Sequence, residues 1–285
     1  MKTFENFDLT NYNSYRVRSV CSRAFFPDTE EDLIYIYKNL KNFKLIGTGH
    51  NIIFSKSYYE EDFVILNGNF SNVNVIKDSS IIEAESGVTM LSLSEVALEN
   101  SLSGLEIFYD IPSSLGGAVV MNAGASGEEI KDVITKVRYL DCEDFSIKEK
   151  TNQEIGFEFR NSFFQKNTKN VVLKVQMKLT PSNYTIIKEK METVKEKRWA
   201  KQPKNLPNAG SVFKRPKGYY VGAMIDELEL KGMSVGGAKI SEKHGGFIIN
   251  YNNATGQDII SLIKIVKDKV RSHFDVELEV EQRVI

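Results

Sequence analysis

The sequence predicts an α+β protein of two domains. Its 285 residues exceed the usual size of one domain but are few for three separate cores. Helices and short strands follow one another without the regular strand–helix alternation of a parallel sheet. Because a polar stretch opens at Pro181, we expect a first domain over 1–181, with subdomains of about 1–67 and 68–181, and a smaller α+β domain over 182–285.

The first half carries helices and short strands in mixed order. Residues 28–32, Asp-Thr-Glu-Glu-Asp, supply a capping residue and first-turn acids, and apolar residues then recur at helical spacing as far as Leu40. Strands at 43–46 and from Ile52 flank a glycine turn. Further strands are expected at 63–66, 73–76, 81–84, 133–142 and 171–179, and a helix at about 89–100.

The second half is expected to begin with a charged helix at about 186–199. Pro203, Pro207 and Pro216 then bracket an irregular loop. Helices are predicted over 220–228 and 255–274, and strands over 246–250 and 276–285. The last strand would place Glu277, Glu279 and Glu281 on one face.

Composition argues against several classes of protein. The net charge is -1, which gives no reason to expect a nucleic-acid or membrane partner. No apolar run approaches the roughly 20 residues of a membrane-spanning helix. Residues 1–13 lack an apolar signal core, and Cys21 and Cys142 are far apart, so a cytoplasmic protein with reduced thiols is expected. The three histidines show no metal spacing: His50, His244 and His273.

The turn Gly47-Thr48-Gly49-His50-Asn51 is the first segment suited to a phosphate. Glycines remove side chains, so backbone N–H groups can approach phosphate oxygens. A simple tight turn explains an isolated Gly-x-Gly at least as well. No helix follows the turn, which disfavours the dinucleotide-binding fingerprint of nicotinamide folds.

A second segment rich in small residues runs from Gly104 to Gly127. It contains Pro112, the pair Gly116-Gly117, and Asn122-Ala123-Gly124. Dense helix packing through small residues is an equal alternative for this segment alone. Taken with the first turn, it suggests a diphosphate held from two sides.

Three further blocks complete a set with a recognisable order and spacing: 157–162, 209–216 and 278–283. With Gly47 to Asn51 and Gly104 to Gly127, they resemble the motifs of the UDP-N-acetylenolpyruvoylglucosamine reductase family, from Ser14-Tyr15-Arg16 to the C-terminus. The short connection 163–170 resembles the branch that lacks a loop carrying a substrate-capping tyrosine.

The resemblance implies an FAD-binding region of the vanillyl-alcohol-oxidase-like type, followed by a smaller substrate domain. FAD would be bound noncovalently, with NADPH as cosubstrate and a UDP-sugar as substrate. The reaction implied is reduction of the enolpyruvyl ether to UDP-N-acetylmuramate, in cell-wall synthesis. The resemblance places the FAD diphosphate at Gly47, Thr48, Gly49, His50, Asn51, Gly116, Gly117, Asn122, Ala123 and Gly124.

The resemblance also assigns the reacting residues. Arg160 falls on the catalytic arginine, Ser211 on the proton-donating serine and Glu281 on the C-terminal glutamate. Lys201 and Arg215 fall where side chains reach the UDP group. Without the resemblance, Arg160 would be interpreted as part of a surface ion pair, Ser211 as a turn serine and Glu281 as part of a solvated strand face.

This chain differs from the family's usual motifs at Arg18, Ser19, His50, Ser113, Phe159 and Val280. Two other functions stay open at the level of sequence. One is another FAD-dependent oxidoreductase of the same fold, which needs neither the Ser211 nor the Glu281 block. The other is a nucleotide-binding or regulatory relative that has lost catalysis, which the differences at Arg18, Ser19, His50 and Ser113 motivate.

Overall fold

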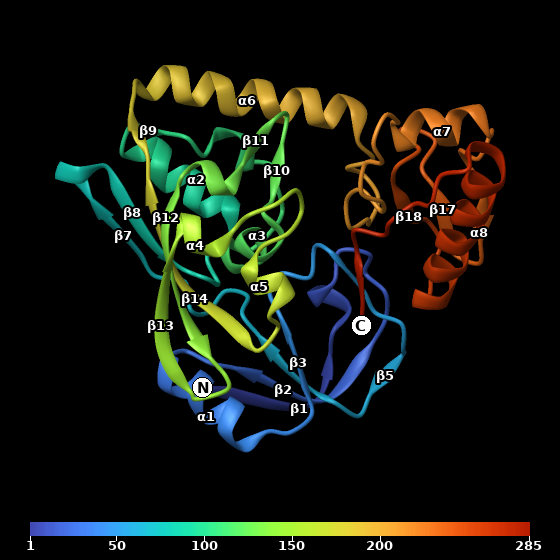
Figure 1. Cartoon of the computed structure of the whole chain (residues 1–285). Coiled ribbons are helices and arrows are strands. Elements are labelled where there is room, and N and C mark those ends of the chain that lie inside the picture. Colours follow the sequence, from blue (N-terminus) through green and yellow to red (C-terminus); the bar gives the residue numbers. More distant parts are fainter. The chain divides into compact units, whose positions relative to one another are not determined.

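The computed structural model describes residues 1–285 and shows an α+β protein, as predicted (Figure 1). The chain forms two compact units. Unit 1 comprises residues 1–4, 24–48 and 62–197, and unit 2 comprises residues 5–23, 49–61 and 198–285. The compact unit thus continues past Pro181 to Lys197, and short N-terminal segments belong to unit 2. The functional boundary at 181 stays a prediction.

One sheet of the structure has the order β1-β2-β6-β3. In unit 1, β2 pairs with β6 and β6 with β3, all in parallel. The two-residue strand β5 also pairs with β2 in parallel. The bounds are β1 Lys2–Asp8, β2 Val20–Phe26, β3 Phe43–Ile46, β5 Tyr58–Tyr59 and β6 Asp62–Ile65.

The second sheet of unit 1 is antiparallel, in the order β13-β12-β14-β8-β7. Its register slips between Arg138 and Tyr139, where Leu173 of β14 is the extra residue. Such a bulge turns the following side chains to the other face of the strand. The bounds are β7 Val73–Ile76, β8 Ile81–Glu85, β12 Ile134–Asp141, β13 Ser146–Thr151 and β14 Asn170–Lys178.

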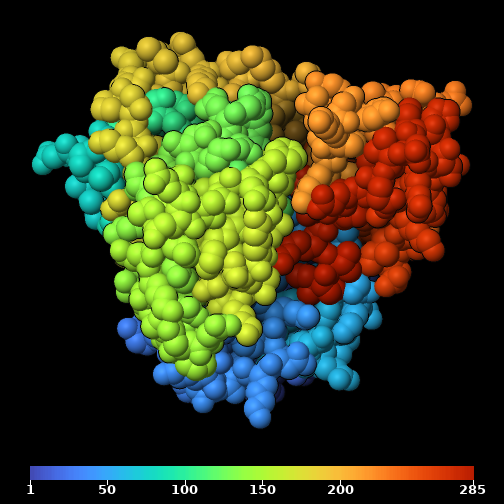
Figure 2. Space-filling view, in the orientation of Figure 1, coloured from blue at the N-terminus to red at the C-terminus, as the bar shows by residue number.

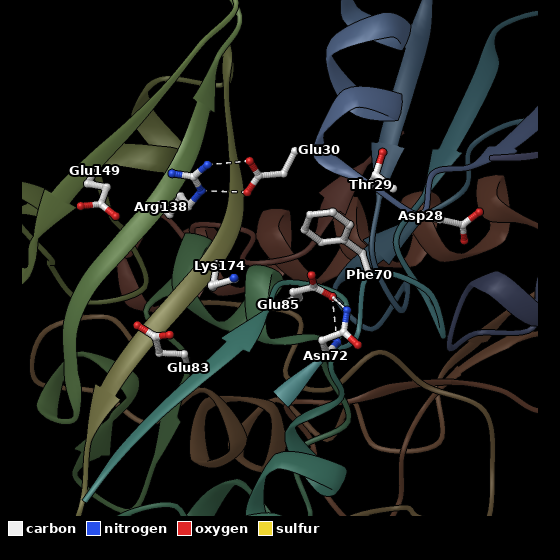
Figure 3. A pocket seen from close by; sticks show the side chains of 10 residues that line it. All are labelled: Asp28, Thr29, Glu30, Phe70, Asn72, Glu83, Glu85, Arg138, Glu149 and Lys174. Carbon is white, nitrogen blue, oxygen red and sulfur yellow. Dashed lines mark hydrogen bonds and ion pairs between the residues drawn. The ribbon is translucent and has the colours of Figure 1, made fainter. Parts of the chain in front are cut away.

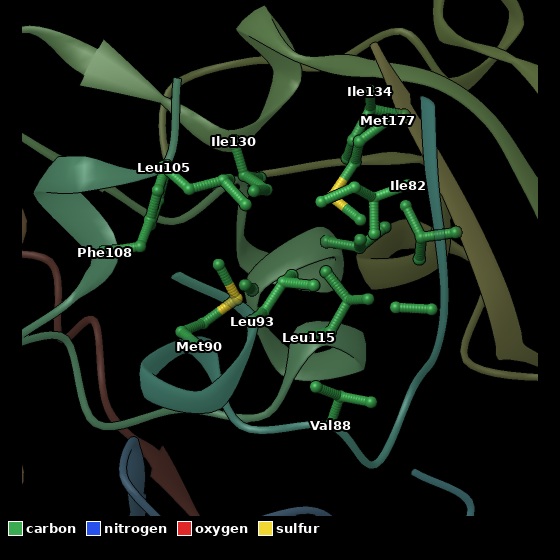
Figure 4. Packing of buried hydrophobic residues seen from close by; sticks show 14 of the residues in the cluster. Ile82, Val88, Met90, Leu93, Leu105, Phe108, Leu115, Ile130, Ile134 and Met177 are labelled. Atoms are coloured by element: carbon green, nitrogen blue, oxygen red, sulfur yellow. The ribbon is translucent and has the colours of Figure 1, made fainter. Parts of the chain in front are cut away.

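The bulge lets β14 contribute to two cores. Val171 and Leu173 pack with α1, whereas Val175 and Met177 pack with α2 and α3. Figure 4 shows the latter cluster, whose buried side chains converge from both helices and the sheet. Thr29 caps α1 through a capping box, as its sequence indicates. The helices are α1 Glu30–Asn39, α2 Met90–Glu99, α3 Leu115–Met121, α4 Asn152–Ile155 and α5 Phe163–Lys166.

Short elements complete unit 1. The small pairs are β9 (Leu102–Ser103) with β15 (Thr180–Pro181), and β10 (Gly124–Ala125) with β11 (Glu128–Glu129). Single 3-10 turns lie at Lys77–Ser79, Glu106–Phe108 and Ile130–Asp132.

Helix α6 (Tyr184–Lys201) lies on the surface, with its outer face uncovered (Figure 2). Ile187 and Met191 are its buried residues, and they pack with Leu98. None of the helices of the chain combines the length and the apolar character that crossing a membrane requires.

Unit 2 contains a three-stranded antiparallel sheet in the order β16-β17-β18, covered by α8. Thr255 caps α8 through a capping box. A parallel pair joins β4 to β19, and a 3-10 turn lies at Thr10–Tyr12. The bounds are β4 Ile52–Ile53, β16 Ser234–Val235, β17 Ala238–Ile240, β18 Ile248–Asn250, β19 Arg283–Val284, α7 Val221–Glu227 and α8 Gly256–Phe274.

The predicted strand over 276–285 is wrong for most of its length. Only Arg283–Val284 form a regular strand, and Val280 makes a single bridge to Phe213. The alternation of apolar and acidic residues reflects an extended segment in which Leu278 is buried while Glu277 and Glu279 are exposed. A buried side of an irregular segment produces the same alternation as a strand face.

Candidate active site

The loop of residues 47–51 joins β3 to β4, so the glycine turn lies between two strands, as predicted. Gly49 has a φ of 74°, and a Cβ there would lie 2.0 Å from the Tyr12 carbonyl oxygen. Only glycine fits this position. No backbone hydrogen bond of the structure has its donor among the amides of residues 48–51. Unused N–H groups in a glycine turn are suited to phosphate oxygens, so this loop fits the FAD diphosphate.

The second glycine segment meets the first within unit 1. The Ser114 amide donates to Thr48 Oγ1 at 3.1 Å, and a Cβ on Gly47 would lie 2.4 Å from Ser114 Oγ. The Gly116 and Gly117 amides, however, donate to the Ser86 carbonyl and to Ser114 Oγ. Gly116 allows close packing of α3 against Ser86, and the N–H groups of both glycines are already used.

Sequence reasoning missed Ser86. Its hydroxyl is buried without a hydrogen-bond partner, directly beside Gly116. A buried polar group without a partner is unusual and marks a place where a ligand atom could bind. Only its proximity to Gly116 in space identifies it, and nothing in the sequence near residue 86 does.

Arg160 occupies the tip of a tight turn in unit 1. Glu158 and Asn161 close the turn with reciprocal backbone hydrogen bonds of 3.0 and 3.2 Å, and Arg160 has a φ of 54°. Its Nη1 donates to the Asn122 carbonyl at 3.2 Å and its Nη2 to the Gly124 carbonyl at 2.7 Å. The Asn122–Gly124 segment, expected at the diphosphate, therefore also holds the guanidinium.

Asn122 itself is fully buried at the end of α3 in the left-handed conformation. Its side-chain amide donates to the Glu158 carbonyl at 2.9 Å. The same residue thus fixes both the turn that carries Arg160 and the guanidinium itself. Asparagine tolerates this backbone conformation better than most residues, which explains its use at this position.

Ser211 and Glu281 lie on neighbouring segments of unit 2. Ser211 bridges Phe247, and the Glu281 amide donates to the Val212 carbonyl at 2.9 Å. Ser211 is exposed and Glu281 is partly buried. Glu281 therefore differs from the exposed Glu277 and Glu279, as its proposed role requires. The structure brings these two predicted residues together.

Gln282, also missed from sequence, connects these segments. Its Nε2 donates to the carbonyls of Ala209, Gly210 and Ser211 at 3.0 to 3.4 Å. Its Oε1 accepts from the hydroxyl of the fully buried Tyr15 at 2.9 Å. Gln282 itself is buried. In the sequence, only its position next to Glu281 could have indicated a role for Gln282.

The remaining predicted residues of unit 2 have varied surroundings. The side-chain Nδ2 of Asn51 donates to the Glu281 carbonyl at 3.2 Å. Burial, followed by the positive charges of Arg16 and Lys204, lowers the pKa of His50 to about 4, and its Nδ1 is buried without a partner. His50 is therefore neutral at physiological pH.

Lys201 ends α6, and both Lys201 and Arg215 are exposed.

A surface pocket of about 590 Å³ in unit 1 contains none of the predicted site residues (Figure 3). Its lining is charged, and much of it is internally paired. Arg138 bonds Glu30 through two contacts of 2.7 and 2.8 Å, and Asn72 bonds Glu85. We assign it no part in the reaction.

Two family models match the chain. The "FAD binding domain" matches residues 22–145, and "UDP-N-acetylenolpyruvoylglucosamine reductase, C-terminal domain" matches residues 202–285. The first match, together with the glycine loop and its unused amides, defines a flavoprotein that binds FAD.

Individual proteins are similar over nearly the full length. The UDP-N-acetylenolpyruvoylglucosamine reductases of Francisella tularensis and Caldanaerobacter subterraneus are 38% and 40% identical, covering 99% and 100% of this chain and 99% and 94% of theirs. The crystal structure of the reductase from Thermus caldophilus superposes with a TM-score of 0.83 at 28% identity, covering 99% of this chain and 98% of that one. The chain belongs to the UDP-N-acetylenolpyruvoylglucosamine reductase family.

Proposed function

We propose that this protein reduces UDP-N-acetylglucosamine enolpyruvate to UDP-N-acetylmuramate with NADPH, and that Arg160, Ser211 and Glu281 carry the chemistry. The observation that supports this most strongly is identity of 38–40% to reductases of this name over 99–100% of the chain. Bound FAD would supply the hydride-transfer chemistry between NADPH and the enolpyruvyl group. The residues of the chain bind, orient and protonate around that transfer.

Arg160 would stabilise the negative charge that develops beside the substrate carboxylate. Its guanidinium is held by two backbone carbonyls and is mostly buried, with 19% of the side chain exposed. A cation that is already oriented loses little energy to reorganisation when charge develops. The Glu129 carboxylate lies 3.9 Å from Nη1, farther than the carbonyl oxygen that each of the two guanidinium nitrogens contacts.

Ser211 would deliver the proton to the carbon next to the carboxylate. A hydroxyl is a weak acid, but a carbanion-like centre is strongly basic, so the transfer is favourable. Ser211 is exposed, and a backbone bridge to Phe247 fixes its segment. The hydroxyl is therefore available to a substrate without breaking the loop.

Glu281, in its protonated form, would donate a hydrogen bond to the same developing charge. Its backbone is fixed from two sides: its N–H donates a hydrogen bond to the Val212 carbonyl, and its carbonyl accepts one from Asn51 Nδ2. Two backbone anchors restrict where the carboxyl group can point. A carboxylic acid used as a hydrogen-bond donor is an established way to stabilise an oxyanion.

We further propose that residues 1–181 bind FAD and residues 182–285 bind the UDP-sugar, with Lys201 and Arg215 contacting the UDP group. The exposure of both side chains supports this, since a solvent-facing cation is accessible to a ligand phosphate. We also propose that the enzyme works in the cytoplasm, where its nucleotide substrates are made.

Anaerobic stopped-flow spectroscopy tests the proposal. Purified protein should be yellow, heat or acid should release the colour, and NADPH should bleach it. Adding the enolpyruvyl sugar should then restore the oxidised spectrum. A protein that bleaches but does not reoxidise with this sugar would be a different flavin oxidoreductase, and a colourless protein that cannot be reconstituted would be an inactive relative.

Replacing Lys201 or Arg215 by alanine should raise KM for the UDP-sugar while kcat changes little. Both side chains would contact the remote UDP group, so their loss removes binding that is equal in ground and transition states. Steady-state kinetics with varied sugar measures both constants. An unchanged KM with lowered kcat would place the residue at the reacting atoms instead.

A further inference from the structure

Arg215 and its neighbour Lys214 are held in opposite ways. Lys214 Nζ forms an ion pair with Glu279 at 2.5 Å. Arg215 has no carboxylate within ion-pair distance, and its Cζ lies 3.7 Å from the ring centroid of Tyr220. Its Nε donates to the Tyr219 carbonyl at 3.3 Å. Lys214 is therefore paired with an opposite charge, whereas Arg215 is not.

The two contacts of Arg215 leave its outer edge free. The aromatic ring fixes the plane of the guanidinium, and the Tyr219 carbonyl occupies Nε, while Nη1 and Nη2 donate to no group of the protein. A planar fork with two unused nitrogen atoms matches the geometry of a phosphate. Stacking on an aromatic ring favours one orientation without using these donors.

A tight turn brings the two tyrosines under the arginine. Gly218 has a φ of 83°, and the Tyr219 amide donates to the Pro216 carbonyl at 3.2 Å. The chain therefore reverses between Arg215 and Tyr220, which immediately precedes α7. Tyr220 is 64% exposed, so its aromatic ring contributes little to the hydrophobic core, and its contact with Arg215 offers another reason for its presence.

We propose that Tyr220 is a positioning residue of the UDP site: its ring holds the Arg215 guanidinium in the orientation that meets the diphosphate of the nucleotide. The inference rests on the proposed contact between Arg215 and the UDP group. Tyr220 itself touches neither the reacting atoms nor the diphosphate.

Replacing Tyr220 by leucine tests this role. The dissociation constant of UDP for the FAD-loaded enzyme, measured by calorimetry, should rise about two- to fivefold, the size of an exposed cation–π contact. KM for the UDP-sugar should rise equally and kcat should stay unchanged. Tyr220→Phe keeps the ring and should behave like the parent. A thermal unfolding scan of each variant establishes that it is folded.

Tyr251→Leu is the matched control. Tyr251 is also exposed in unit 2, and its ring lies 4.4 Å from Lys239 Nζ. This variant loses a comparable cation–π contact at a place with no proposed role in binding. UDP affinity should not change, whereas an equal loss in both variants would show a general effect of removing surface rings and overturn the proposal.

Arg215→Ala separates the inference from the function on which it rests. If this variant binds UDP as the parent does, the proposed Arg215 contact is wrong. If it binds weakly and Tyr220→Leu binds normally, only the positioning role is wrong. Adding Tyr220→Leu to Arg215→Ala should cost nothing more, because the ring acts through the arginine. A further loss in the double variant, or weaker binding of uridine without phosphates, would mean that the ring contacts the ligand directly.

Discussion

The Arg160 turn of unit 1 and the Ser211–Glu281 region of unit 2 fix their site residues differently. In unit 1 the functional side chain also holds the local structure together, because the Arg160 guanidinium donates hydrogen bonds to the carbonyls of Asn122 and Gly124. In unit 2 the proposed site residues are fixed by their backbones, and a neighbour, Gln282, connects the segments. Removing Arg160 thus removes charge and local structure together, whereas Ser211 can be changed alone.

Ser211→Ala should give the largest loss of activity, and this loss should be confined to one half-reaction. Reduction of FAD by NADPH should stay near normal, while reoxidation by the enolpyruvyl sugar should slow by about 10² to 10⁴, the usual contribution of a general acid. Rapid mixing of each half-reaction measures both rates. Substrate affinity and stability should hardly change, because no backbone contact is lost.

Cysteine at position 211 provides the control for proton delivery. A thiol is of similar size and more acidic than a hydroxyl, so it should restore part of the lost rate. Reoxidation of Ser211→Ala at the parental rate, with equal substrate binding, would refute the proton-donor role.

Gln282→Leu should instead lower stability. It leaves the buried Tyr15 hydroxyl and the carbonyls of the 209–211 segment without their partner, which costs about 2–3 kcal/mol in the free energy of unfolding. Urea unfolding of the FAD-loaded protein measures this. Ser211→Ala is the comparison, because it should unfold like the parent. Equal stability of both variants would show that Gln282 contributes no more to stability than Ser211 does, and would contradict the contrast between the two residues.

Gly47→Ala should weaken FAD binding about tenfold. The new Cβ would lie 2.4 Å from Ser114 Oγ, so the loop or α3 must move, at a cost typical of overpacking. Fluorescence of released flavin reports the dissociation constant. Gly222→Ala, where the nearest atom lies 3.9 Å from the new Cβ, is the control and should bind FAD normally.

His50 should give the smallest effect, visible as a dependence of stability on pH. Its pKa of about 4 lies below the ordinary value near 6.5, so between these values the unfolded chain binds the proton and the folded chain does not. The stabilisation is present above about pH 6.5 and is lost as the pH falls toward 4. The difference in unfolding free energy between parent and His50→Gln should shrink by about 1 kcal/mol from pH 7 to 5.5. An unchanged difference would place the ring in solvent.

Local sequence signals determined most elements because short-range chemistry fixes them. β3 and β7 occupy the predicted residues, and Thr29 caps α1, since apolar alternation and capping need only neighbours in sequence. Glycine spacing likewise predicted a turn between two strands. The order of the motif blocks indicated the family, which the relatives confirm.

Contacts between distant segments were decided only by the tertiary structure. The bulge at Leu173 depends on pairing with β12, and the extended C-terminal segment alternates like a strand without forming one. The Asn122 carbonyl accepts a hydrogen bond from Arg160, and Gln282 bonds both the Ser211 carbonyl and Tyr15, which lies 267 positions before it in the sequence. A hydrogen bond depends on the distance and angle between two groups, and the sequence near either group does not specify its partner. The residue types were therefore readable from the sequence, whereas the partners that hold them in place were fixed by folding.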